Sequence, residues 1–194
     1  MRIRPFLVLA LLSSLWIGPA AAEQYLLDPA HSSVEFSVQH LVLTPVKGDF
    51  TQFSGEIFYD EAAAAKSWVK IIIKADSINT NEPDRDKHLK SKDFLFTKKY
   101  PEIVFESRRI DKMEGGYLCL GTLSLHGVSK QIGIPFVITG AIKDPQGKTR
   151  LGLEGALTLD RRDYGIVWNK VMEGGGLVVG NDVKIALSVE AILQ

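Results

Sequence analysis

The sequence VKIALSVEA, residues 183–191, alternates between two sets of side chains without a break. Its odd-numbered positions are Val, Ile, Leu, Val and Ala, and its even-numbered positions are Lys, Ala, Ser and Glu. An apolar side chain at every second position is typical of a β-strand with one face in a core and the other in water. We therefore predict a half-buried strand here.

The same period of two recurs along the chain, in the runs 33–40, 69–73, 102–106, 132–138 and 151–159. Turn signals separate the later runs, namely Glu114-Gly115-Gly116, His126-Gly127 and Asp144-Pro145-Gln146-Gly147. The runs predict about eight strands at short, even spacing, as in antiparallel sandwiches and barrels. The chain is therefore expected to be all-β.

One segment breaks this period. From Pro83 to about Lys92 the sequence is rich in charge, and proline favours the first position of a helix. Asp84 and Asp86 would lie near the positive end of the helix dipole, and the following lysines near its negative end. We predict one short helix that lies on a surface or plugs an opening.

The first 22 residues have the composition of a secretory signal peptide. Arg2 and Arg4 precede the apolar run from Phe6 to Ile17, and the small triplet Ala20-Ala21-Ala22 follows it. The run is shorter than the roughly 20 apolar residues that span a bilayer. We predict cleavage after Ala22, which leaves residues 23–194 as a single domain.

A secreted chain of alternating strands also raises the possibility of an outer-membrane barrel. In such barrels the apolar residues face the lipid. Here the positions that alternate with the apolar ones include Lys70, Lys74, Glu102, Glu106, Lys184 and Glu190. A lysine or arginine on a lipid face costs about 2–4 kcal/mol near the midplane. We therefore predict a soluble barrel with no membrane span and with its apolar faces inside.

Charge and cysteine content exclude other classes. The chain has 23 basic and 23 acidic residues, whereas nucleic-acid binders carry a basic excess. Cys119 is the single cysteine, so it forms no disulfide within the chain, and its apolar surroundings favour a packed thiol over a reactive one.

The motifs that usually carry catalysis or a cofactor are missing from the sequence. There is no G-x-S-x-G nucleophile motif, and no glycine-rich loop follows a strand and opens a helix. The four histidines have no spacing that brings two imidazoles to one metal. We predict no catalytic residues, no metal and no cofactor.

An eight-stranded barrel is either filled by its own side chains or holds one small ligand. Periodicity does not decide between these, because a packed core and a lipid pocket use the same residue types. His40 shares a face with Phe36 and is either a core histidine or a donor to a ligand. Arg161 and Arg162 either form salt bridges with Asp160 or Asp163 at the rim, or place a guanidinium against the polar head of a ligand.

Four stretches, in order, resemble one family. They are 28–36 (DPAHSSVEF) followed by His40; 48–55 (GDFTQFSG); 76–105, with DSINT at 76–80 and RDKHLKS at 85–91; and 121–128 (GTLSLHGV) followed by 161–165 (RRDYG). They identify the chain as similar to the YceI-like family of secreted lipid-binding proteins. It departs from the family pattern at Tyr164, where phenylalanine is common, and at Arg162, an additional basic residue.

The resemblance implies an extended lipocalin-like antiparallel eight-stranded barrel with one short helical insertion. It also implies a periplasmic location, no catalysis, and an apolar interior that holds a long-chain isoprenoid or a related amphiphilic lipid. The predicted ligand-binding residues are Phe36, His40, Phe53, Ile71, Phe105, Phe136, Arg161 and Trp168. The alternative role of the apolar members is ordinary core packing.

Two other functions stay open at this point. One is a structural or stress-linked periplasmic protein with a filled barrel, and the other is an enzyme that acts on an isoprenoid lipid. A homodimer is also possible, because sheet edges and the apolar stretch Leu177-Val178-Val179 could pair with a second copy.

Overall fold

The structure is a computed structural model that describes residues 23–41, 43–60, 63–171 and 177–194. The predicted signal peptide, residues 1–22, lies outside the described residues. Most of the glycine-rich loop that follows Val171 also lies outside them.

The described residues form eleven strands, one α-helix and four short 3-10 helices. The strands are β1 (Glu23–Leu27), β2 (Ser33–His40), β3 (Thr44–Phe50), β4 (Phe53–Tyr59), β5 (Trp68–Lys74), β6 (Ile78–Asn79), β7 (Glu102–Met113), β8 (Gly116–Leu125), β9 (Val128–Lys143), β10 (Thr149–Asp160) and β11 (Val179–Leu193). The helices are η1 (Pro29–His31), η2 (Ala64–Lys66), η3 (Ala75–Ser77), α1 (Pro83–Leu89) and η4 (Arg161–Tyr164).

The strands close into a barrel. Its ring runs β1-β4-β5-β7-β8-β9-β10-β11, and β11 pairs with β1 to complete it. All of these pairs are antiparallel. Eight strands in a closed ring and one short α-helix confirm the predicted fold class.

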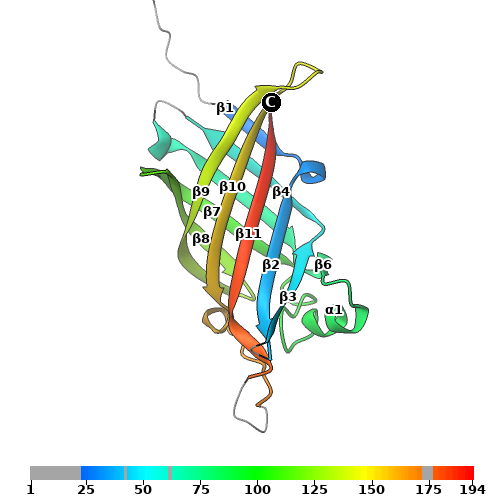
Figure 1. The fold of residues 1–194 in the computed structure, drawn as a ribbon. Coiled ribbons are helices and arrows are strands. Elements are labelled where there is room, and N and C mark those ends of the chain that lie inside the picture. The colour runs from blue at the N-terminus through cyan, green and yellow to red at the C-terminus, as the bar shows by residue number, and fades with distance from the viewer. Residues whose placement is uncertain (1–22, 42, 61–62, 172–176) are drawn as a thin grey trace, which may run out of the picture.

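Three further strands extend the sheet at one end. Strand β11 pairs with β1 near its end, through Ala191 and Leu27, and with β2 further back, through Ser188 and Ser33. Strands β3 and β6 continue the sheet beyond β2. Figure 1 shows that β2, β3 and β6 lie on the side of the barrel where α1 is found, away from the C-terminus.

The alternation of residues sorts charged side chains to the outside. Lys70 and Glu106 lie opposite each other on β5 and β7 and form an ion pair of 2.7 Å. Lys74 and Glu102 form a similar pair of 2.6 Å on the same two strands. The side chains of both pairs are about half exposed, which confirms that this face of the sheet is solvated.

The hairpin between β8 and β9 turns through His126 and Gly127. Both residues have positive φ, 52° and 78°, as a two-residue type I′ turn requires. A Cβ on Gly127 would lie 2.5 Å from Cε1 of Tyr100. Gly127 therefore meets two constraints, a left-handed backbone and an aromatic ring directly against it.

We expect Gly127→Ala to lower the free energy of unfolding by about 2–3 kcal/mol, because it adds a clash to the cost of a left-handed residue. Urea denaturation measures this. Gly115→Ala is the matched control, since Gly115 has φ of 78° in the β7–β8 turn but no atom within 4 Å of its would-be Cβ. The control should lose only about 1 kcal/mol. Equal losses of unfolding free energy in Gly127→Ala and Gly115→Ala would show that Tyr100 moves aside at no cost.

Helix α1 begins at the predicted proline and ends at Leu89, three residues before the predicted end. The side chain of Glu82 caps its first turn by accepting from the backbone N–H groups of Asp84 and Arg85. Beyond Leu89 the chain folds back, and the backbone N–H of Leu95 donates to the carbonyl of Leu89. This tight return ends the helix and brings Phe94 toward the barrel.

Two clusters of buried side chains occupy the interior. One contains Tyr25, Ile57, Leu151 and Ala191. They belong to β1, β4, β10 and β11, and Ala191 lies three residues before the C-terminus that is marked in Figure 1. The other contains residues of β7, β8 and η4, among them Phe105, Leu123 and Tyr164. The interior is therefore packed at one end and along one wall.

Candidate functional site

The remaining interior is hollow. A cavity of about 410 Å³ lies inside the barrel and extends to the end covered by α1 and η4. This volume falls within the range of about 300–1,000 Å³ that is usual for small-molecule sites. The barrel is therefore only partly filled by its own side chains.

Inward-facing apolar side chains form the wall of this cavity. Val38 of β2, Val183 of β11 and Leu159 of β10 lie side by side in the register and all line it. Ile71 of β5 and Phe105 of β7 are also direct neighbours across two strands and line the opposite part. The alternation that makes each strand thus also makes the cavity apolar.

Apart from Glu35 of β2, the polar lining residues gather at one end. His40 is the last residue of β2 and pairs with Val179, the first residue of β11. Arg161 lies near this pair, because it donates to the carbonyl of Val179. The polar lining residues at this end are Gln39, His40, Arg85, His88, Arg161 and Tyr164. An amphiphile placed in the cavity would therefore meet apolar walls along its length and polar groups at the α1 end.

Arg161 is held by the protein through all five of its N–H groups. Its side chain is 5% exposed. Nε donates to the carbonyl of Gly180 at 2.9 Å, and Nη1 donates to the carbonyls of Ile166 and Trp168 at 2.7 and 2.9 Å. Nη2 makes two longer bonds, to the carbonyl of Val179 and to Oδ1 of Asn181. The guanidinium thus ties the segment after η4 to the start of β11.

The charge of Arg161 has no acidic partner within ion-pairing distance among the described residues. Burial lowers the pKa of the guanidinium from its ordinary value, yet arginine stays protonated at neutral pH. The exposed Arg162 instead forms the salt bridge with Asp160, at 2.5 Å. Of the two alternatives left open by the sequence, the salt bridge is therefore found for Arg162, whereas Arg161 forms none among the described residues.

Three aromatic rings lie together at the α1 end of the cavity. His88 packs edge-on against Phe94 and Trp168, with ring centroids 5.0 and 4.8 Å apart. Nε2 of His88 lies 3.1 Å from Oδ2 of Asp93. All three rings line the cavity, together with Arg85 and Leu89 of α1.

The structure brings six of the eight predicted ligand-binding residues to the cavity wall: Phe36, His40, Ile71, Phe105, Arg161 and Trp168. Their role in binding stays a prediction. Arg85, His88 and Tyr164 also line the cavity and were not predicted. They come from α1 and η4, where no strand periodicity exists to show which way a side chain faces.

Phe53 and Phe136 do not line the cavity. Phe53 lies opposite Ile73 and on the same face of β4 as the buried Ile57, so its inward face was predicted correctly although it is not part of the cavity wall. Phe136 stacks on Tyr117, with ring centroids 5.2 Å apart, and packs against the β7–β8 side of the core. Both positions were predicted from alternation alone, which cannot say how far along the barrel a pocket extends.

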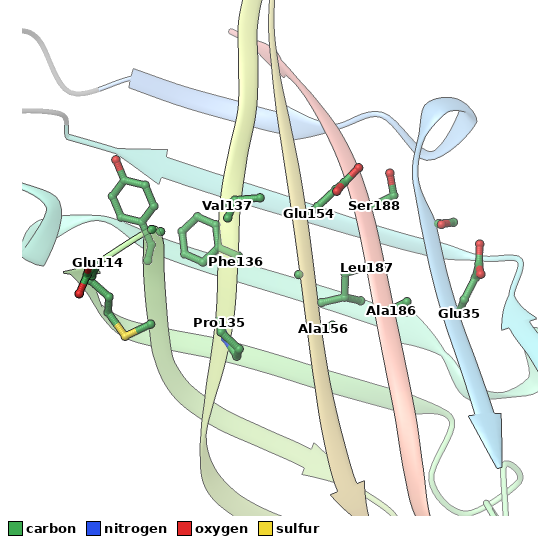
Figure 2. Close-up of a pocket in the computed structure, with 16 residues that line it drawn as sticks. Glu35, Glu114, Pro135, Phe136, Val137, Glu154, Ala156, Ala186, Leu187 and Ser188 are labelled. Carbon is green, nitrogen blue, oxygen red and sulfur yellow. The ribbon is translucent and has the colours of Figure 1, made fainter. Parts of the chain in front are cut away.

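Phe136 instead borders a second, open depression of about 550 Å³. Figure 2 shows it spread over neighbouring strands, with Glu154 on β10, Ser188 on β11 and Glu35 on β2. The side chains of Glu154 and Ser188 are exposed and alternate with the residues that line the cavity. This depression therefore belongs to the outer face of the barrel.

One cluster of acidic and histidine side chains has the proximity of metal ligands, namely Asp28, His31 and Glu190. Nη1 of Arg150 already bonds Oδ2 of Asp28 at 2.9 Å and the carboxylate of Glu190. The hydrogen bond with His31 lowers the pKa of Asp28, and the bond from Arg150 lowers it further. A guanidinium between the two carboxylates occupies the place of a cation, so the cluster is a salt-bridge network.

Cys119 is 5% exposed, and burial raises the pKa of its thiol to about 11. The thiol is therefore protonated at neutral pH and a poor nucleophile.

Among the described residues, no helix has the length and apolar character needed to cross a bilayer.

Comparison with known proteins gives consistent results. The family model for the YceI-like domain matches residues 25–191. A UPF0312 protein of Vibrio parahaemolyticus is 39% identical over 161 residues, which are 81% of this chain and 85% of that protein.

Two solved structures have similar folds. The crystal structure of the YCEI protein of Campylobacter jejuni is 30% identical, covers 80% of this chain and 90% of its own, and has a TM-score of 0.68. A polyisoprenoid binding domain from Saccharophagus degradans is 18% identical, covers 90% of this chain and all of its own, and has a TM-score of 0.64. At that identity the second likeness shows the fold alone.

Proposed function

Because the chain belongs to the YceI-like domain family, we propose that it is a periplasmic, non-catalytic protein that binds a long-chain isoprenoid or a related amphiphilic lipid inside its barrel. The observation that carries this proposal is the cavity of about 410 Å³, with apolar walls and polar groups at one end. The naming of a relative of the same fold as a polyisoprenoid binding domain supports the choice of ligand.

The driving force is the burial of the lipid tail. Each Å² of apolar surface removed from water contributes about 25 cal/mol. The cavity is already formed, so the tail is buried without the conformational cost of ordering a new core. In this proposal the tail lies between β2, β5, β7 and β11, and the head lies toward His40 and η4.

A filled barrel is disfavoured by the cavity itself. An enzyme is disfavoured by the chemistry of the lining. Cys119 carries a protonated thiol and does not line the cavity. Arg161 has its N–H groups engaged by the protein.

Native mass spectrometry of the mature chain, purified from its own host, tests the proposal. A bound mass that extracts into organic solvent and fragments as an isoprenoid lipid is the expected result. A bare chain that also fails to take up added isoprenoid lipid would overturn it. The same spectrum reports the oligomeric state and so tests the predicted homodimer, and recovery from a periplasmic fraction with Glu23 as first residue tests the predicted cleavage.

A further inference from the structure

Tyr164 carries a polar atom that the protein does not use. The side chain is 1% exposed, and its hydroxyl is buried with no hydrogen-bond partner among the described residues. Tyr164 belongs to η4 and lines the cavity. Buried polar side-chain atoms are nearly always hydrogen-bonded in native proteins, so an unpartnered one in a cavity wall requires an explanation.

The other buried hydroxyls among the described residues are paired. The hydroxyl of Tyr25 donates to the carboxylate of Glu23, and Oγ of Ser67 accepts from the backbone N–H of Asp60 at 2.9 Å. A phenylalanine at position 164 would supply the same ring to the core without the polar atom. The backbone of Tyr164 is satisfied separately, because its carbonyl lies 2.9 Å from Nδ1 of His126. The hydroxyl is therefore the one feature of this residue that packing does not explain.

The surroundings favour an electron-rich partner. Arg161 lies three residues earlier in the same short helix, lines the same cavity and carries a buried positive charge with no acidic partner within ion-pairing distance among the residues described. Nζ of Lys130 lies 6.0 Å from the centre of the Tyr164 ring, but it is paired with the carboxylate of Asp163 at 2.7 Å, so its charge is balanced. The positive charge that favours an acceptor oxygen on a ligand in this cavity is therefore that of Arg161.

We propose that the Tyr164 hydroxyl donates a hydrogen bond to an acceptor oxygen on the head of the bound lipid. The ligand class is therefore an isoprenoid with a carbonyl, ester or phosphate oxygen, rather than an isoprenoid hydrocarbon. This inference rests on the proposed function, because it assigns a role within the same cavity.

The test compares two probes, geranylgeranylacetone and the hydrocarbon of the same carbon skeleton. The ketone oxygen accepts a hydrogen bond but cannot donate one. Tyr164→Phe should raise the Kd for the ketone about tenfold and leave the Kd for the hydrocarbon unchanged or lower. Tyr25→Phe is the matched control, because it removes a buried hydroxyl outside the cavity, and it should leave the ratio of the two Kd values unchanged.

Thermal melting of the ligand-free protein provides a second measurement. Removing an unpartnered hydroxyl should leave the melting temperature of Tyr164→Phe equal to or above that of the wild type, whereas Tyr25→Phe should melt lower. A fall for Tyr164→Phe that matches the control would show that the hydroxyl has a structural partner and would overturn the inference.

The two proposals fail in different ways. Wild-type protein that binds neither probe contradicts the proposed function and the role of Tyr164 with it. Wild-type protein that binds both probes, with a Kd ratio that Tyr164→Phe does not change, contradicts only the role of Tyr164.

Discussion

Val183→Trp is expected to abolish most lipid binding while the barrel stays folded. Val183 faces Val38 on β2 and Leu159 on β10, and all three line the cavity. An indole at this position occupies space that the lipid tail would otherwise fill. If it excludes one branched five-carbon unit, about 100 Å² of tail surface stays in water, which costs about 2.5 kcal/mol or about 70-fold in Kd.

Displacement of a fluorescent lipid probe measures this change. Ala186→Trp is the matched control, because Ala186 lies on the same strand but faces outward and is exposed. The control should bind as the wild type does. Circular dichroism and the slope of urea denaturation establish that both variants keep the barrel. Unchanged binding by Val183→Trp would place the ligand outside the barrel and refute the proposed function.

Arg161→Met is expected to lower the free energy of unfolding by about 3–5 kcal/mol. The substitution leaves four backbone carbonyls and Oδ1 of Asn181 without their shared donor, in a site where Arg161 is 5% exposed. Removing one partner of a buried charged network costs about this much, because the remaining polar groups are not returned to water.

Arg162→Met is the control for Arg161→Met. Arg162 pairs with Asp160, its side chain is 56% exposed, and exposed pairs contribute about 1 kcal/mol or less. Arg161→Lys should fall between the two, because an ammonium keeps the charge but lacks the planar fork of donors. Urea denaturation ranks the three variants. Equal losses in Arg161→Met and Arg162→Met would show that the segments joined by Arg161 hold without it.

These two predictions separate the two kinds of lining residue. Val183 contributes space, so changing it alters binding more than folding. Arg161 forms hydrogen bonds that join the segment after η4 to the start of β11. Changing it is therefore expected to lower the free energy of unfolding more than it changes lipid binding. Tyr164 is the residue whose hydroxyl is proposed to donate a hydrogen bond to the head group of the lipid.

Much of the fold follows from local pattern. Alternation in residues 183–191 and in the other runs predicted strands and their inner faces, because successive side chains of a strand point to opposite sides of a sheet. The turn at His126 and Gly127 and the short helix after Glu82 also follow from local chemistry. The charges at Lys70 and Glu106 predicted which face meets water, and their ion pair confirms it.

The site depended more on tertiary structure. Alternation predicted that Phe105 and Phe136 both face inward and line the cavity. Only Phe105 lines it, while Phe136 stacks on Tyr117. Arg161 read as a candidate for a ligand or a salt bridge, and its actual acceptors are carbonyls up to 19 residues away in sequence. No local pattern records such partners.

The sequence by itself determined that this chain makes antiparallel strands with one apolar face and one charged face. The sorting of side chains to two faces depends only on the period of neighbouring residues. Only the tertiary structure decided that the enclosed space is packed near Tyr25 and hollow near His40 and Tyr164. The physical reason is that filling depends on how side chains from distant strands meet across the barrel, and that meeting is set by closure of the sheet rather than by any single stretch of the chain.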